Sequence, residues 1–185
     1  MKAQKSPIFR DLPVPKNTYV TCPHEAYKLV APYLEPLRQE VFLVLALNTR
    51  SRAISLHTVS AGLLDSSLVG PREVFRRLIE KSAFSAIIAH NHPSGDSTPS
   101  SNDHAATRTI QKAGDIIGIA IRDHLIVGDN EFYSFADKRS SYFEEGSTIL
   151  RSEEIAHDMA VARIVSENEA TYKTYLKEAL ESYRR

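Results

Sequence analysis

Apolar runs of strand length recur along this chain, and stretches with helical spacing lie between them. Residues 40–49 are almost continuously apolar after the first position, which is typical of a strand buried on both faces. A second such stretch follows at 53–62, and the polar residues 48–52 predict a hairpin turn between the two. Further strands are predicted over residues 84–92, 117–128 and 131–137, with a hairpin at 128–130 joining the last two.

Three segments have the apolar spacing of a helix that packs on one face. They are residues 22–37, 70–83 and 102–114. Thr21 is the predicted N-cap of the first helix, and Pro32 and Pro36 should kink or end it. Gly114 is the predicted C-terminal stop of the third. Because helices and strands alternate, the sequence predicts an α/β fold, with a mixed central β-sheet flanked by helices.

The two ends of the chain differ from its middle. The sequence predicts an extended N-terminal leader over residues 1–20, a folded domain over 21–145, and a helical C-terminal extension over 146–185. From Ser152 onward there is no glycine or proline, which predicts an added amphipathic helix. This helix either packs on its own domain or forms a homo-oligomer contact. Its two apolar stripes are Ile155, Met159 and Ala162, and Tyr172, Leu176, Ala179 and Tyr183.

Composition narrows the class of protein. The chain carries 23 basic and 23 acidic residues, so its net charge gives no reason to expect nucleic acid as a partner. A single cysteine, Cys22, excludes a disulfide framework within the chain and fits a reducing compartment. The sequence shows no signal peptide and no apolar run of membrane-spanning length. We therefore expect a soluble, cytoplasmic protein without a membrane contact.

The residues with chemical potential gather where a predicted strand runs into a polar loop. His90 and His92 stand two apart at the end of that strand, so both imidazoles should point to the same face. Asp103 lies in the first turn of the next predicted helix, where the helix dipole favours a carboxylate. If this turn folds back over the strand end, the three side chains form a zinc site with a fourth position open for water.

Two further residues complete the candidate site. Ser100 can contact a metal-bound species or serve only as the N-cap of the helix, a role that Ser101 can also fill. Glu40 begins an otherwise apolar strand, where a carboxylate is costly without a partner. It is a candidate proton acceptor for the metal's water. On position alone, Glu40 could equally be an exposed residue at the edge of the strand.

The order His90-x-His92, seven residues, Ser100, two residues, Asp103 resembles the zinc signature of the JAMM, or MPN-plus, metalloproteases. With the flanking blocks "VGPREVF", "DHLIVG" and "YSF", most of the chain is similar to the JAB domain of the RadC family. The resemblance implies a JAB/MPN-like fold with cytidine-deaminase-like topology. It also implies one zinc ion per chain on His90, His92 and Asp103. Ser100 would support the metal water or the oxyanion, and Glu40 would be the general acid and base.

Four other polar residues are candidates for positioning or substrate contact. Arg72 and Glu73, near a predicted helix start, form either a simple ion pair or a substrate contact. Asp123 is a candidate hydrogen-bond partner for a ligand histidine. His124 can orient the site, although a histidine in a strand is more often a satisfied core residue.

The predicted function is zinc-dependent hydrolysis of an amide bond in a peptide or protein, by a metallopeptidase or isopeptidase. The alternative is a non-catalytic RadC-like interaction module linked to DNA repair or recombination. A zinc nucleobase deaminase is excluded, because its site needs His-x-Glu and a Pro-Cys-x-x-Cys pair, whereas Cys22 is the only cysteine. A metalloprotease of the His-Glu-x-x-His type is excluded because that motif does not occur.

Overall fold

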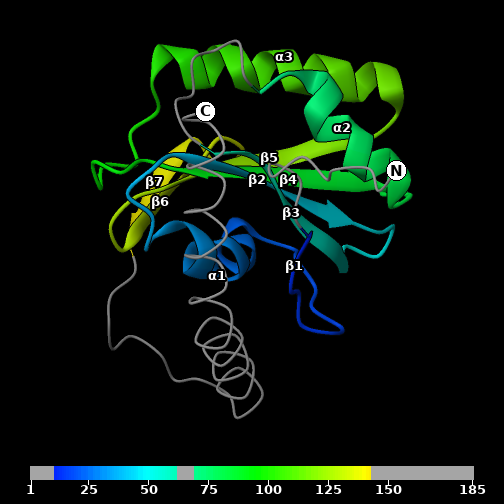
Figure 1. Cartoon of the computed structure of the whole chain (residues 1–185), viewed down its shortest axis with the longest axis horizontal. Helices are drawn as coiled ribbons and strands as arrows, with labels where there is room; N and C mark the ends of the chain where they lie inside the picture. Colours follow the sequence, from blue (N-terminus) through cyan, green and yellow to red (C-terminus); the bar gives the residue numbers. More distant parts are fainter. Residues whose placement is uncertain (1–10, 62–68, 143–185) are drawn as a thin grey trace, which may run out of the picture.

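The computed structural model describes residues 11–61 and 69–142 of the chain. Within them, seven strands form one sheet in the order β1-β3-β2-β4-β5-β6-β7. Helix α1 covers one face, and α2 and α3 cover the other (Figure 1). Strands β4 and β5 are parallel and the other paired neighbours are antiparallel, which confirms the predicted α/β fold with a mixed central sheet. None of the helices in the described ranges is long and apolar enough to cross a membrane.

The helices and strands have the following bounds. The strands are β1 (Asp11–Leu12), β2 (Val41–Leu47), β3 (Ala53–Ala61), β4 (Ser85–Asn91), β5 (Ala120–Val127), β6 (Glu131–Ser134) and β7 (Arg139–Tyr142). The helices are α1 (Pro23–Leu34), α2 (Pro71–Glu80) and α3 (Ser101–Ile117).

Strand β2 lies between two hydrophobic cores, and this explains its continuous apolar sequence. Leu43 and Leu45 pack in the cluster that includes α1. Phe42 and Val44 point to the opposite face and pack in the cluster that includes α2 and α3. All seven residues of the strand are buried, as the sequence predicted.

Both predicted hairpins are present. In the first, the N–H of Asn48 donates to the carbonyl oxygen of Arg52 at 3.0 Å, and β2 and β3 pair antiparallel on either side. In the second, the N–H of Gly128 donates to the carbonyl oxygen of Glu131 at 2.9 Å, and Asn130 takes up a left-handed conformation with φ 54°.

The two ends of α1 differ from the prediction. Its N-cap is Cys22 and not Thr21. The carboxylate of Glu25 accepts hydrogen bonds from the N–H groups of Thr21, at 2.6 Å, and Cys22, at 3.3 Å, so the helix begins one residue later than predicted. Pro32 lies in the last turn without ending the helix, which stops shortly before Pro36.

The prediction that Gly114 ends α3 is wrong. The helix continues to Ile117, and the C-cap is Gly118, whose φ of 82° suits a residue without a side chain. Gly114 has a packing role instead. A Cβ atom there would lie 2.6 Å from the carbonyl oxygen of Ile119 and 3.2 Å from Cζ of Phe75, so only glycine allows this close approach of α3 to its neighbours.

The ends of the described region add two strands that were not predicted from the sequence. Residues 11–20 fall in the predicted leader, yet Asp11 and Leu12 pair with β3 as an edge strand, and Leu12 is buried. The hydroxyl of Tyr33 in α1 donates to the carbonyl oxygen of Pro13 at 2.9 Å and holds this segment against the helix. Strand β7 pairs with β6 at the opposite edge. The predicted C-terminal helix lies outside the described residues.

Candidate metal centre

Four side chains that can bind a metal converge at one end of β2 and β4. His90 in β4 pairs with Phe42 in β2, and this pairing brings Glu40, just before β2, to the same end of the sheet. His92 follows β4 directly, and Asp103 lies in the first turn of α3. One ligand atom from each of Glu40, His90, His92 and Asp103 lies within 4.8 Å of the others. The fold thus brings together the residues that were predicted from the sequence to be metal ligands and a general base.

The distances within this cluster fit a small tetrahedral cation. His90 Nε2 lies 3.1 Å from His92 Nε2 and 3.1 Å from Asp103 Oδ1. It lies 3.6 Å from Glu40 Oε1, and His92 Nε2 lies 3.5 Å from Asp103 Oδ2. For zinc–ligand bonds of about 2.0–2.1 Å, the ligand atoms of a regular tetrahedron stand about 3.3–3.4 Å apart. The spacing of these side chains is therefore compatible with a bound metal ion.

The hydrogen bond of His92 Nδ1 determines whether the other ring nitrogen, Nε2, carries a hydrogen where it faces the cluster. His92 Nδ1 lies 2.8 Å from the carbonyl oxygen of Asp96, which carries no hydrogen, so Nδ1 must donate. In the neutral imidazole, Nε2 is then an acceptor that faces His90 and Asp103. Acceptor atoms at such distances repel one another unless a positive charge lies between them, and a bound metal ion would supply that charge.

The pKa values of these groups show the same preference for positive charge. Burial alone would raise the pKa of Asp103, but its close contacts with the imidazoles of His90 and His92 hold it well below its usual value. The contact with Asp103 raises the pKa of His92, against the lowering effect of burial. The pKa of Glu40 is raised, because its partial burial outweighs the opposite effect of His90 and His92. A carboxyl group with a raised pKa binds a proton more readily than an ordinary glutamate.

Ser100 is the N-cap of α3, as one of the two alternatives predicted, and Ser101 is the first residue of the helix. The Ser100 hydroxyl donates to Asp103 Oδ2 at 2.6 Å and accepts from the N–H of Asp103 at 3.2 Å. The N–H of Ser100 donates to the same carboxylate oxygen at 2.7 Å. These reciprocal bonds hold the carboxylate of Asp103 where it faces both histidines.

The loop between β4 and α3 is folded back on itself and tied to the second hairpin. The N–H of Gly95 donates to the carbonyl oxygen of His92 at 3.0 Å and closes a tight turn. Gly95 has φ +85°, and a Cβ atom there would lie 3.3 Å from Cβ of Asp129. The carbonyl oxygen of Gly95 accepts from the N–H of Asp129 at 2.8 Å. This anchoring fixes the position of His92 relative to β5.

Asn91 positions Glu40, a role that was not predicted from the sequence. It lies between the two histidines but points to the opposite face of β4. Its side-chain oxygen accepts from the N–H of Val41 at 2.8 Å, and its amide nitrogen donates to the carbonyl oxygens of Gln39, at 3.0 Å, and Leu37, at 3.3 Å. The segment that carries Glu40 is thereby held beside β4. A buried polar residue at the end of an apolar strand was the available indication, since such a group needs a partner.

The two candidates in β5 have different surroundings. His124 is fully buried, and its Nε2 lies 2.8 Å from His90 Nδ1. Burial lowers the pKa of His124 well below its usual value. The hydrogen-bond partners of Asp123 differ from the ligand histidine that was its predicted partner. Its carboxylate accepts from the N–H groups of His124 and Ala136 and from the hydroxyl of Ser134, and so holds the end of β6.

Arg72 and Glu73 lie in the first turn of α2 and form an ion pair with each other at 2.8 Å. The side chain of Arg72 is 92% exposed, which fits the simple ion pair that the sequence allowed. An exposed pair of this kind contributes little to stability, because water screens it.

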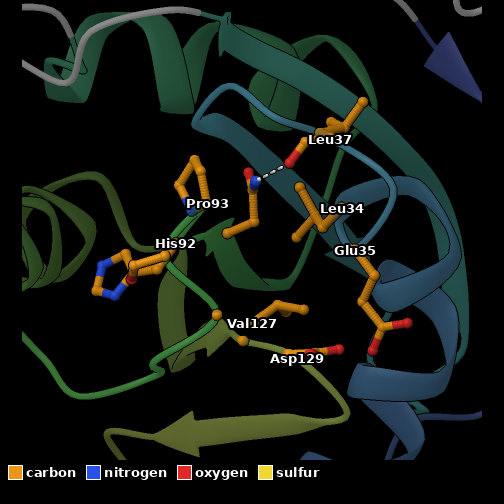
Figure 2. Close-up of a pocket in the computed structure, with 11 residues that line it drawn as sticks. Leu34, Glu35, Leu37, His92, Pro93, Val127 and Asp129 are labelled. Atoms are coloured by element: carbon orange, nitrogen blue, oxygen red, sulfur yellow. Dashed lines mark hydrogen bonds between the residues drawn. The ribbon is translucent and has the colours of Figure 1, made fainter.

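A cavity of about 210 Å³ adjoins the cluster, with His92 on its border. It is lined by the end of α1, the turn that begins at His92, and the hairpin between β5 and β6. In Figure 2, the imidazole of His92 points away from Glu35 and Asp129, and the carboxylates of Glu35 and Asp129 point toward one another. The ring of His92 is therefore directed away from the part of the cavity that holds these two carboxylates.

The fold and the cluster define this protein as an α/β domain with a candidate metal centre at the end of its central strands. A family model described as the RadC-like JAB domain matches residues 20–140. The chain belongs to this family.

Curated relatives support the assignment. The UPF0758 protein of Desulforamulus reducens is 45% identical over 127 residues, which are 69% of this chain and 56% of that protein. A UPF0758 protein of Listeria monocytogenes is 49% identical over 123 residues, which are 66% of this chain and 55% of that protein. One of Caldanaerobacter subterraneus is 43% identical over 129 residues, which are 70% of this chain and 55% of that protein. The chain thus spans about half the length of these relatives.

Proposed function

We propose that this domain is a zinc-dependent hydrolase that cleaves an amide bond in a peptide or protein substrate, as a metallopeptidase or isopeptidase. The observation that carries the proposal is the cluster of Glu40, His90, His92 and Asp103, whose ligand atoms lie within 4.8 Å of one another. Membership in a JAB-domain family supports it, because the resemblance to JAMM metalloproteases rests on the same residues.

In this proposal His90, His92 and Asp103 would hold the metal. Zinc, when bound, would polarise the scissile carbonyl group and lower the pKa of a water molecule from 15.7 to about 7. Glu40 would take a proton from the attacking water and return it to the leaving nitrogen, as general base and then general acid. Its raised pKa and its position 3.6 Å from His90 Nε2 support this role.

Ser100 is proposed to stabilise the oxyanion of the tetrahedral intermediate by a hydrogen bond. This requires its hydroxyl hydrogen to turn from Asp103 Oδ2, to which it donates in the structure, toward the reacting carbonyl group. We further propose that the substrate chain extends past His92 into the adjoining cavity.

Metal content and turnover of three proteins test the proposal. Plasma mass spectrometry on the wild type should find one zinc per chain, which His92→Ala should lose and Glu40→Gln should keep. Peptide and isopeptide substrates should be cleaved by the wild type alone, because Glu40→Gln removes only the proton acceptor.

Two outcomes would contradict the proposal. A wild type that stays free of zinc, even after zinc is added at neutral pH, would show that the cluster is not a zinc site. Turnover that survives Glu40→Gln would remove the base from the mechanism. In either case the non-catalytic interaction module becomes the better interpretation.

A further inference from the structure

A chain of three buried side chains leads away from the metal cluster into the protein. His90 Nδ1 lies 2.8 Å from His124 Nε2, and His124 Nδ1 lies 2.6 Å from Thr107 Oγ1. His90 and His124 are fully buried, and Thr107 is 3% exposed. Every polar atom in this chain must therefore find its hydrogen-bond partner within the protein, so the hydrogens can be assigned in order.

The assignment begins at Thr107. Its Oγ1 lies 2.6 Å from the carbonyl oxygen of Asp103, one helical turn earlier in α3. Two oxygen atoms approach this closely only with a hydrogen between them, and a carbonyl oxygen has none to offer. The hydroxyl hydrogen of Thr107 is therefore used toward Asp103, and Oγ1 can only accept from His124.

The assignment continues through His124. Because Thr107 Oγ1 accepts, His124 Nδ1 must carry the hydrogen of the 2.6 Å contact. A fully buried imidazole without a carboxylate as hydrogen-bond partner is neutral and has a single N–H group. His124 Nε2 is then an acceptor, and the hydrogen of its 2.8 Å contact must come from Nδ1 of His90.

We infer that Thr107 and His124 are positioning residues that fix His90 in the tautomer with its hydrogen on Nδ1, so that the lone pair of His90 Nε2 points into the metal cluster. This inference rests on the proposed function for its purpose, since the lone pair is needed to bind the metal. His92 reaches the same tautomer by another route, through the loop carbonyl group of Asp96. One turn of α3 thus supplies the ligand Asp103 and also the hydroxyl that orders the ligand His90.

The test combines nuclear magnetic resonance with zinc affinity. Long-range ¹H–¹⁵N spectra of metal-free protein with ¹⁵N-labelled histidine report which ring nitrogen carries the hydrogen, and the His90→Gln and His124→Phe variants assign the signals. We expect hydrogen on Nδ1 of both His90 and His124 in the wild type. Zinc affinity, measured by competition with a chelator, should fall about 10- to 100-fold in Thr107→Val.

Two further variants separate positioning from packing. Thr107→Ser keeps the hydroxyl and should restore both the tautomer and the zinc affinity. Thr109→Val is the matched control, because Thr109 Oγ1 donates to the carbonyl oxygen of Ala105 at 2.9 Å in the same helix but on an exposed face. It should change neither measurement.

Three results would overturn the inference: hydrogen on Nε2 of His90 or His124 in the wild type, an imidazolium form of His124, or unchanged zinc affinity in Thr107→Val. A wild type that binds no zinc would contradict the proposed function instead. The spectra of the metal-free protein would then still decide the tautomer of His90.

Discussion

Two buried histidines on the same face of the sheet have opposite surroundings. His57 in β3 pairs with Val44, Val44 pairs with Ile88, and Ile88 pairs with His124 in β5, so the four residues form one row across the strands. Both histidines are fully buried. His124 has a hydrogen-bond partner at each ring nitrogen, whereas neither nitrogen of His57 has one within residues 11–61 and 69–142.

The difference comes from the helix that covers each histidine. Helix α3 brings the hydroxyl of Thr107 to His124. Helix α2 brings Arg77 close to His57, but the terminal nitrogens of Arg77 bind Asp11 and Glu80, and its Nε has no hydrogen-bond partner among the described residues. A buried polar group without a partner costs about 1–3 kcal/mol. Burial alone therefore does not distinguish the two histidines, whereas their hydrogen-bond partners do.

The difference between the two histidines should have its largest effect on the free energy of unfolding at acidic pH. Burial, and then the charge of Arg77, lowers the pKa of His57 from 6.5 to about 4. In the unfolded chain, His57 binds a proton as the pH falls below 6.5, whereas in the folded protein it does so only near pH 4. The contribution of neutral His57 to the free energy of unfolding is therefore present above pH 6.5 and is lost as the pH falls through this window. The loss is about 3 kcal/mol, at ~1.4 kcal/mol for each pKa unit.

Urea denaturation at neutral pH and near the lower end of this window measures that loss. His57→Leu should lose less stability on acidification than the wild type, by the amount that His57 contributes. Equal acid losses in the two proteins would show that other groups, such as the buried His124, account for the whole effect.

The next largest effect should come from removing the satisfied histidine. His124→Phe keeps an aromatic ring among Phe42 and Phe135, which already contact the imidazole. It leaves the buried N–H of His90 without an acceptor, so the free energy of unfolding should fall by about 1–3 kcal/mol. Calorimetry and urea denaturation of metal-free protein measure this loss. A variant as stable as the wild type would mean that the network contributes nothing to stability.

The unsatisfied histidine should respond in the opposite direction. Above pH 7, where His57 is neutral in both the folded and the unfolded state, His57→Leu removes two nitrogens that have no partner in the described part of the chain and fills the space with apolar atoms. We expect the free energy of unfolding to rise by about 1–2 kcal/mol. Zinc affinity should stay unchanged, since His57 does not belong to the metal cluster. Destabilisation of this variant would show that His57 has a partner, such as water, that its surroundings provide.

The residues around His124 also show which features of the site could be predicted from the sequence. His90, His92 and Asp103 could be selected because a strand alternates with a period of two and a helix start favours a carboxylate, and both rules act over short distances. The contact of Thr107 with His124 joins a helix to a strand 17 residues later, and only tertiary packing creates it.

The short edge strand at Asp11 escaped prediction for a related reason. Two residues carry no periodicity, and pairing with β3 supplies the order that the local sequence lacks. The continuous apolar run of β2, in contrast, was long enough to show burial on both faces before any partner strand was known.

The smallest effect should come from the charges that surround His57. The carboxylate of Asp11 lies 3.0 Å from Lys81 Nζ and 3.3 Å from a terminal nitrogen of Arg77, and its side chain is 47% exposed. Exposed pairs of this kind contribute at most about 1 kcal/mol, so Asp11→Asn should lower the free energy of unfolding by less than that, and by less still in high salt. Urea denaturation at low and high salt measures both. A loss that is larger and independent of salt would show that Asp11 holds the residues around His57 in place. The difference between His57 and His124 would then involve the edge strand β1 as well as hydrogen bonding.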